Sequence, residues 1–199
     1  MRLFVAIELD EEARRRIGAE EKRLQQVLGS RDRSILKWVR PEHMHLTLVF
    51  LGELSEDRTG IIVEAMTRPI EGQRFGVGFG GFGVFPARGA PRVLWLGVMR
   101  GGQEVAAVQR QVVERVERLG IGLENRAFHP HLTLARWRAA VYADRHGVLA
   151  SAGQQEVAGI DVDAVTLVES RLSSAGPTYR ALCRARLGGD TRPTLQSER

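Results

Sequence analysis

The sequence predicts an α+β fold made of two similar halves, with antiparallel strands inside, helices outside and a cleft between two lobes. Three observations support this fold. The residues His-Leu-Thr-Leu occur twice, at 45–48 and at 131–134, each time inside a stretch typical of a strand. The order strand, helix, motif strand, helix, strand recurs around both copies. With 199 residues and 43% hydrophobic content, the chain can bury a sizeable core.

Boundary residues mark the elements of the first half. A short apolar run before Asp10 predicts a buried strand, and Asp10 followed by two glutamates predicts the start of a helix that Gly29 ends. Ser55 before Glu56 and Asp57 predicts a second helix start in the same way. The expected elements are a strand at 3–9, a helix from Asp10 to about Leu28, the first motif strand to Leu51, a helix from Ser55 to about Thr67, and a glycine-rich pair of strands at 74–85.

The second half begins after the turn-forming segment 86–91, which is rich in proline and glycine. The expected elements are a strand at 93–98, a helix at about 103–119, the second motif strand at about 128–135, a helix at about 142–152, and strands at about 162–169 and 179–187. We therefore expect one bilobal domain at 1–187, with pseudo-repeats at about 1–91 and 92–187. The polar residues 188–199 are expected to form a disordered tail.

Composition limits the classes of partner and compartment. The formal net charge is +5 and arginine outnumbers lysine, which suits phosphate contacts but equally describes a soluble arginine-rich surface. Cys183 is the only cysteine, which excludes an intramolecular disulfide and a cysteine-based zinc site. Because the sequence shows neither a signal peptide nor a segment of membrane-spanning length, we expect a cytoplasmic protein without membrane contact.

The repeated motif has the chemistry of a phosphate site. Strand alternation places His45 and Thr47 on one face and the motif leucines on the other, and it does the same for His131 and Thr133. Two imidazoles can divide acid and base catalysis near neutral pH, while two hydroxyls can donate hydrogen bonds to non-bridging phosphate oxygens. A single His-x-Thr is common by chance, but its recurrence in matching strands favours a shared site that needs no metal.

Two further histidines allow a metal-binding alternative. His43 and His129 each precede a motif histidine by two residues and share its face. Four imidazoles could bind a transition metal, but the paired threonines would then be unexplained. We therefore interpret His43 and His129 as rim or packing residues that could tune the pKa of their neighbours.

Several aromatic side chains could stack on a nucleobase or lie in the core. For the tryptophan at 95 the core is favoured. The candidates are Phe50, Trp95, Trp137 and Tyr179.

Taken together, these segments resemble the two-histidine (2H) phosphoesterase superfamily, and within it the bacterial and archaeal RNA 2',3'-cyclic phosphodiesterases, formerly called 2'-5' RNA ligases. The similarity extends over nearly everything but the tail. The matching segments are 2–7, 38–42, 45–52, 81–86, 91–95, 130–136, 169–172 and 176–179.

The resemblance implies a role for each motif residue. His45 would be the general acid and His131 the general base, while Thr47, Thr133 and Arg136 would bind the phosphate. Strict alternation puts Arg136 on the leucine face, so we expect it to reach the cleft from the frayed end of its strand.

The implied reaction is hydrolysis of the 2',3'-cyclic phosphate end of an RNA or nucleotide to a 2'-phosphomonoester. The resemblance implies no cofactor, no metal and no obligate protein partner, and a monomer. Two alternatives stay open. The same residues could act in reverse as a 2'-5' RNA ligase, or the chain could be a catalytically silent module that binds RNA ends.

Overall fold

The structure is a computed structural model that describes residues 1–28, 35–124, 127–140, 142–150, 153, 155–173 and 176–188. Gly29, expected to end the first helix, lies outside these residues, as does the expected tail except for Gly188.

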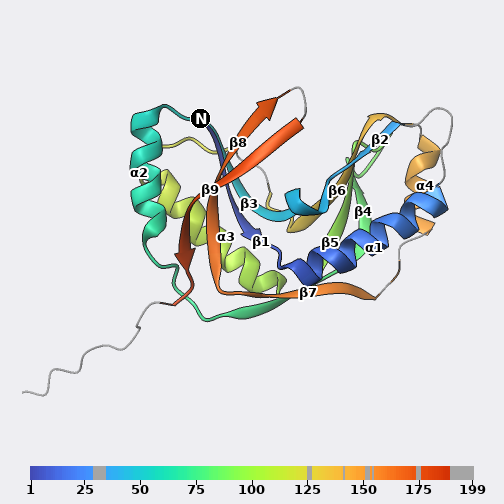
Figure 1. The fold of residues 1–199 in the computed structure, drawn as a ribbon, viewed down its shortest axis with the longest axis horizontal. Helices are drawn as coiled ribbons and strands as arrows, with labels where there is room; N and C mark the ends of the chain where they lie inside the picture. Colours follow the sequence, from blue (N-terminus) through green and yellow to red (C-terminus); the bar gives the residue numbers. More distant parts are fainter. Residues whose placement is uncertain are drawn as a thin grey trace, which may run out of the picture.

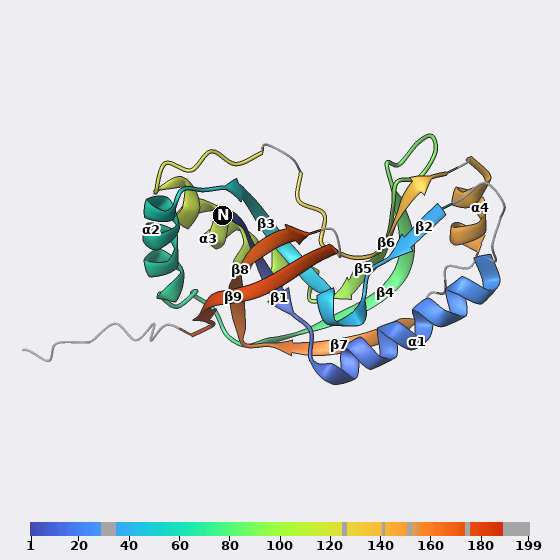
Figure 2. The same cartoon turned by 45° about the horizontal axis from the view of Figure 1, so that its top comes forward.

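One curled antiparallel sheet of nine strands runs through the molecule, with helices at its two ends (Figures 1 and 2). The predicted α+β class is confirmed. The strands are β1 (Arg2–Glu8), β2 (Ile35–Trp38), β3 (His45–Glu53), β4 (Phe75–Phe85), β5 (Val93–Arg100), β6 (His131–Ala139), β7 (Glu156–Val162), β8 (Ala164–Ser173) and β9 (Gly176–Arg186). The helices are α1 (Glu11–Leu28), α2 (Glu56–Thr67), α3 (Gly102–Glu117), α4 (Tyr142–Ala150) and the 3₁₀ turn η1 (Pro41–His43).

Two lobes of the sheet meet at the motif strands. The strand order is β7-β4-β5-β6-β3-β1-β8-β9, with β2 added to β6. Among the described residues, β3 and β6 pair only through Leu46 and Leu132. The sheet is therefore continuous but narrow at this junction, and the two histidine motifs lie where the lobes join.

Each lobe contains strands from both halves of the sequence. β8 and β9 from the second half extend the lobe that contains β1 and β3, while β4 from the first half extends the lobe that contains β5 and β6. The helices follow the same exchange, since α1 packs on β7 whereas α3 packs on β3. The lobes in space are thus not the halves of the sequence.

The predicted helix starts are confirmed by their caps. The backbone N–H of Ala13 donates to Oδ1 of Asp10 at 2.7 Å, and that of Arg58 donates to Oγ of Ser55 at 3.4 Å. These side chains satisfy donors that the first helical turn leaves free. No described helix is both long enough and apolar enough to cross a membrane.

The glycine-rich segment differs from the prediction. It forms one 11-residue strand, β4, rather than a pair of strands. Gly81 has a φ of 66° and lies between Gly80 and Phe82, where the register with β5 shifts by one residue. A bulge at a glycine bends the strand without ending it, so what looked like a turn in the sequence is a bend.

Two strands lie where none was predicted, β2 and β7. β2 has only four residues, and β7 contains Gly159 and Asp161 among its seven. Both pair with long neighbouring strands, β6 and β4. Tertiary pairing stabilises these strands where their own sequence does not.

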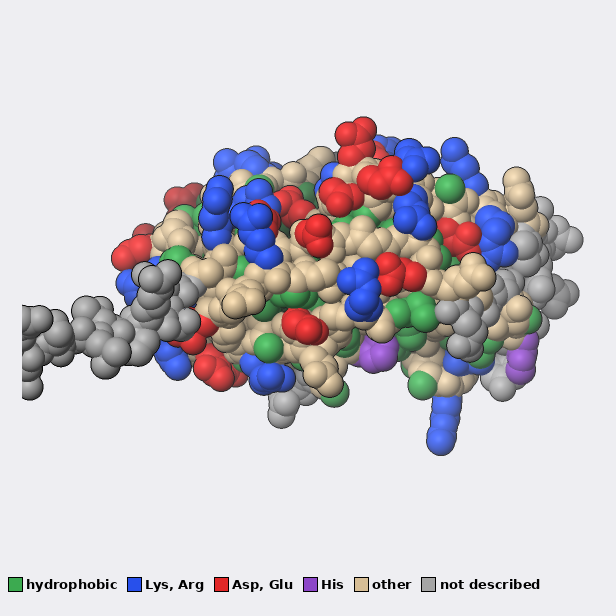
Figure 3. Space-filling view, turned by 90° about the horizontal axis from the view of Figure 1, so that it is seen from below, with side chains coloured by type: hydrophobic (Ala, Val, Ile, Leu, Met, Phe, Trp, Pro, Cys, Tyr) green, Lys and Arg blue, Asp and Glu red, His purple; other side chains and the backbone are tan. Residues whose placement is uncertain are grey.

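Charge is dispersed on the face drawn in Figure 3, where basic and acidic side chains alternate over the surface. On this face the arginines therefore fit the interpretation that they form a soluble, solvent-exposed surface and do not bind phosphate. A phosphate-binding role has to be argued from the residues of the cleft.

Candidate active site

The antiparallel junction of β3 and β6 brings the two motifs together. Because Leu46 pairs with Leu132, the chain directions place His45 beside Thr133 and Thr47 beside His131. The leucines are fully buried, whereas the histidines and threonines are half-buried on the opposite face. A repeated sequence in an antiparallel pair thus produces a local twofold arrangement with two imidazoles and two hydroxyls.

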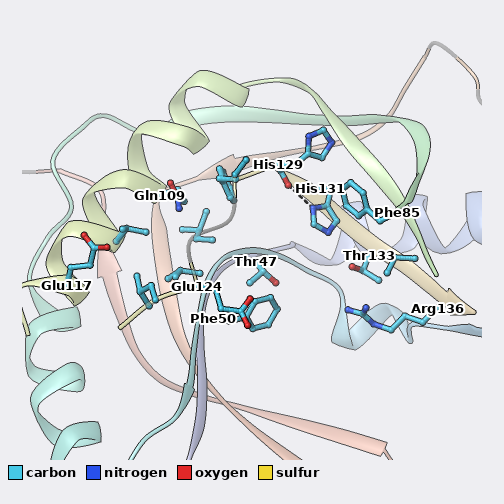
Figure 4. Close-up of a pocket in the computed structure, with 17 residues that line it drawn as sticks. Thr47, Phe50, Phe85, Gln109, Glu117, Glu124, His129, His131, Thr133 and Arg136 are labelled. Carbon is cyan, nitrogen blue, oxygen red and sulfur yellow. Dashed lines mark hydrogen bonds between the residues drawn. The ribbon is translucent and has the colours of Figure 1, made fainter. Parts of the chain in front are cut away.

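Both motif histidines are held in the same way. Nδ1 of His45 lies 2.8 Å from the carbonyl oxygen of His43, and Nδ1 of His131 lies 2.7 Å from that of His129 (Figure 4). A carbonyl oxygen can only accept, so Nδ1 carries the hydrogen in each ring. Nε2 is then the free atom on both sides, and the residues at 43 and 129 position it through their backbone.

Aromatic rings pack around His45. Phe4 stacks on it at 4.6 Å between centroids, and Tyr179 meets it edge-on at 5.3 Å. Tyr179 also contacts the His43 ring at 5.1 Å. The His45 ring is therefore fixed by packing as well as by its hydrogen bond.

His131 has a matching aromatic wall. Phe85 meets it edge-on at 5.1 Å and Trp95 lies at 6.2 Å, while both also contact the ring of His129. Trp95 is half-buried rather than a central core residue, whereas Trp137 packs against the core. Phe50 is 59% exposed and lines the cleft.

Burial controls the protonation of both rings. It lowers the pKa of His45 to about 4, and it lowers the pKa of His131 as well. Desolvation disfavours the imidazolium, so both rings are neutral near pH 7 before an anion binds. Of the smaller influences, the charge of Glu8 raises the pKa of His45, while that of Arg136 lowers the pKa of His131.

Arg136 lines the cleft, but it does so from a paired position in its strand and not from the strand's frayed end as expected. It lies within β6, paired with Val93 and Lys37, and not at a frayed end. The register with β5 passes from Thr133 directly to Ala135, so that the strand bulges there. The extra residue reverses the alternation, and Arg136 joins the face of His131 and Thr133.

Two cavities open from the paired motifs. One, of about 410 Å³, contains both histidines, both threonines and Arg136, so it brings together every site residue expected from the sequence. The other, of about 900 Å³, extends from Thr47, His131, Thr133 and Arg136 towards α3, where Gln109 and Glu117 line it (Figure 4). Together they form a cleft large enough for a nucleotide.

The sequence did not identify Phe4 and Phe85 as part of the site. Phe4 shares the alternating face of its strand with Arg2, whose exposed charged side chain lines the cleft, and this is a signal that could have revealed it. Phe85 gives no such signal, because β4 reaches His131 only through the exchange of strands between lobes. Among the described residues, no group of three or more His, Cys, Asp or Glu side chains could hold a metal ion.

Known proteins are similar to this chain in sequence and in fold. The 2'-5' RNA ligase superfamily matches residues 12–173. The RNA 2',3'-cyclic phosphodiesterase of Archaeoglobus fulgidus is 32% identical over 182 residues, covering 92% of this chain and 98% of that protein. That of Methanothermobacter thermautotrophicus is 33% identical over 181 residues, covering 90% and 95%.

Solved structures show the same architecture. E. coli LigT complexed with 3'-AMP has a TM-score of 0.73 at 26% identity, covering 94% of this chain and 98% of that chain. A second solved structure, TT0787 of Thermus thermophilus, has a TM-score of 0.66 at 29% identity, covering 96% and 100%. The chain therefore belongs to the 2'-5' RNA ligase superfamily, the two-histidine phosphoesterases that its sequence resembles.

Proposed function

We propose that this chain is an RNA 2',3'-cyclic phosphodiesterase that opens cyclic phosphate ends to 2'-phosphomonoesters with two histidines. The observation that carries the proposal is the twofold arrangement of His45 and His131, each with Nδ1 on a carbonyl and Nε2 free. An in-line displacement at phosphorus needs a base and an acid on opposite sides, and this pair supplies both. The activity named for the relatives supports the same reaction.

In the proposed step, Nε2 of neutral His131 takes a proton from water as the water oxygen bonds to phosphorus. The bond between phosphorus and O3' breaks, and Nε2 of protonated His45 gives its proton to O3'. The hydroxyls of Thr47 and Thr133 donate to the non-bridging oxygens, and the Arg136 guanidinium offsets their charge. One proton is taken and one is given, so solvent exchange restores both rings.

The acid and base roles are those that the family resemblance implies, and each ring must meet a different requirement. His131 is ready as a base because burial already keeps it neutral. His45 must gain a proton, although burial lowers its pKa to about 4 in the free protein. A phosphate anion bound beside the ring favours the imidazolium, and the nearby Glu8 carboxylate acts in the same direction.

The test measures opening of an oligonucleotide that ends in a 2',3'-cyclic phosphate. His45→Ala and His131→Ala should each lower kcat by a factor of about 10² to 10⁴ while circular dichroism and Tm show an intact fold. His146→Ala, an exposed histidine of α4, is the matched control and should keep the wild-type rate. A wild-type rate in either site variant contradicts the proposal.

The same proteins and substrate also distinguish the phosphodiesterase from the silent binding module and from the ligase. A bell-shaped dependence of the rate on pH, lost in both site variants, excludes a silent binding module. Product analysis distinguishes a 2'-phosphate from a 3'-phosphate, and an added RNA with a 5'-hydroxyl end measures joining against hydrolysis. Faster joining than hydrolysis would favour the ligase direction.

A further inference from the structure

Two cavities extend from the site in different directions, and a single RNA strand can occupy only one of them. The larger cavity runs over α3 and the smaller one runs beneath the hairpin of β8 and β9. The residues that both share lie at their common point. These are Thr47, Phe50, His131, Thr133 and Arg136.

The two cavities differ in charge. The hairpin cavity has two arginines among its described lining residues, Arg2 and the shared Arg136, and none of these residues is acidic. The α3 cavity is lined by Glu117 and Glu124, and Arg136 is the one cation among its described lining residues. An RNA backbone is a polyanion, so electrostatics favours the hairpin cavity for the strand.

Stereochemistry points to the same side. In a 2',3'-cyclic end, C3' bonds to C4', and C5' beyond it carries the phosphate of the upstream strand. If His45 gives its proton to O3', the C3' side of the ribose faces His45. His45 lines the hairpin cavity but not the α3 cavity, so the upstream strand begins on the hairpin side.

A row of polar side chains is available there. Arg2 of β1 pairs with Ser170 of β8, which in turn pairs with Tyr179 of β9, so the three lie in line across the sheet. All three line the hairpin cavity. The charges of Arg136 and Arg2 both reach the phenol of Tyr179, where they oppose the larger effect of burial on its raised pKa.

We propose that the RNA strand upstream of the cyclic phosphate leaves through the hairpin cavity, with Arg2 binding the first upstream phosphate beside Tyr179. This inference rests on the proposed function. No ion pair of Arg2 or Arg136 is found among the described residues, so both guanidiniums can bind phosphate. Arg171 and Arg180 instead each form an ion pair with Glu169 at 2.9 Å. They occupy the strand positions next to Ser170 and Tyr179, and neither arginine lines the cavity.

The experiment compares two substrates and several variants. One substrate is a 2',3'-cyclic mononucleotide without a 5'-phosphate, and the other is a dinucleotide with one phosphodiester before its cyclic end. Arg2→Gln should lower kcat/KM roughly tenfold for the dinucleotide and leave the mononucleotide within about twofold, as expected for one charged contact. Arg2→Lys, which keeps the charge, should restore most of the loss.

Salt dependence gives a second readout. Loss of one phosphate contact should reduce the slope of log kcat/KM against log salt by about 0.7 for the dinucleotide. Arg171→Gln is the matched control, because Arg171 is an exposed arginine of the same hairpin and does not line the cavity. This variant should leave kcat/KM and its salt slope unchanged for both substrates.

The outcomes are distinct. Equal losses on both substrates, or no loss on either, overturn the assignment of Arg2 to the upstream phosphate. A selective gain for the dinucleotide in Glu117→Gln shows that the strand runs over α3 and overturns the proposed path. Wild-type protein that opens neither substrate contradicts the proposed function itself, and this inference with it.

Discussion

Acid should destabilise this fold through one half-buried histidine, His45. Burial beneath Phe4 and Tyr179 lowers the pKa of His45 from 6.5 to about 4. In the unfolded chain the imidazole has its ordinary pKa near 6.5. Between these two values the unfolded chain binds a proton that the folded protein does not, so the free energy of unfolding falls as the pH falls. This contribution is complete above pH 6.5 and is lost by about pH 4.

The size of the effect follows from the two pKa values. Their separation corresponds to about 3 kcal/mol of unfolding free energy between about pH 7 and pH 4. His45→Gln removes the titration but keeps a polar side chain of similar size. The variant should therefore lose about 3 kcal/mol less than the wild type over this range. Urea unfolding followed by circular dichroism measures the free energy at each pH.

The comparison between the two proteins cancels the titrating groups that do not interact with His45, because these groups are common to both. Parallel curves for the wild type and His45→Gln would refute the assignment of this pH dependence to His45. The ring proton resonances of His45 give an independent test by NMR. A titration midpoint at 6.5 would show that burial beneath the two aromatic rings does not exclude the proton.

Three other perturbations test the site from different directions. Thr47→Val and Thr133→Val keep the side-chain shape and remove the hydroxyl, so each should lower kcat about 100-fold at an unchanged Tm, whereas full activity would remove the threonines from the phosphate site. Gly83→Ala directs a Cβ into the ring of Trp95 and should therefore lower Tm. It should also lower the rate, because Trp95 packs against His131. A wild-type Tm would show that the Trp95 ring moves aside freely. Excess EDTA should leave the rate unchanged, since the proposed step uses only imidazole protons, and a loss restored by a divalent cation would favour the metal alternative.

Local patterns were enough to predict the motif strands and the helix starts. His45 and His131 alternate with buried leucines because one side of each strand faces the core, and that alternation is visible in the sequence itself. Asp10 and Ser55 likewise cap helices through contacts only three residues away. Such features depend on neighbours in the chain, so the chain alone indicates them.

The position of Arg136 and the aromatic wall of His131 depend on distant partners. The bulge in β6 arises from its register with β5, and no residue in the motif itself indicates a bulge. Phe85 reaches His131 only because β4 lies next to β5 in the sheet. Strand pairing across the sequence decides both, which is why strict alternation placed Arg136 on the wrong face.

The exchange of strands between the lobes also bears on how the chain folds. β8 lies beside β1 although about 160 residues separate them in sequence. Such distant pairings close large loops and slow folding relative to local ones. Neither half of the sequence can complete its lobe alone, because each contributes strands to the other. The lobe that contains His45 is therefore complete only when β8 and β9, close to the C-terminal end of the described chain, have added to β1.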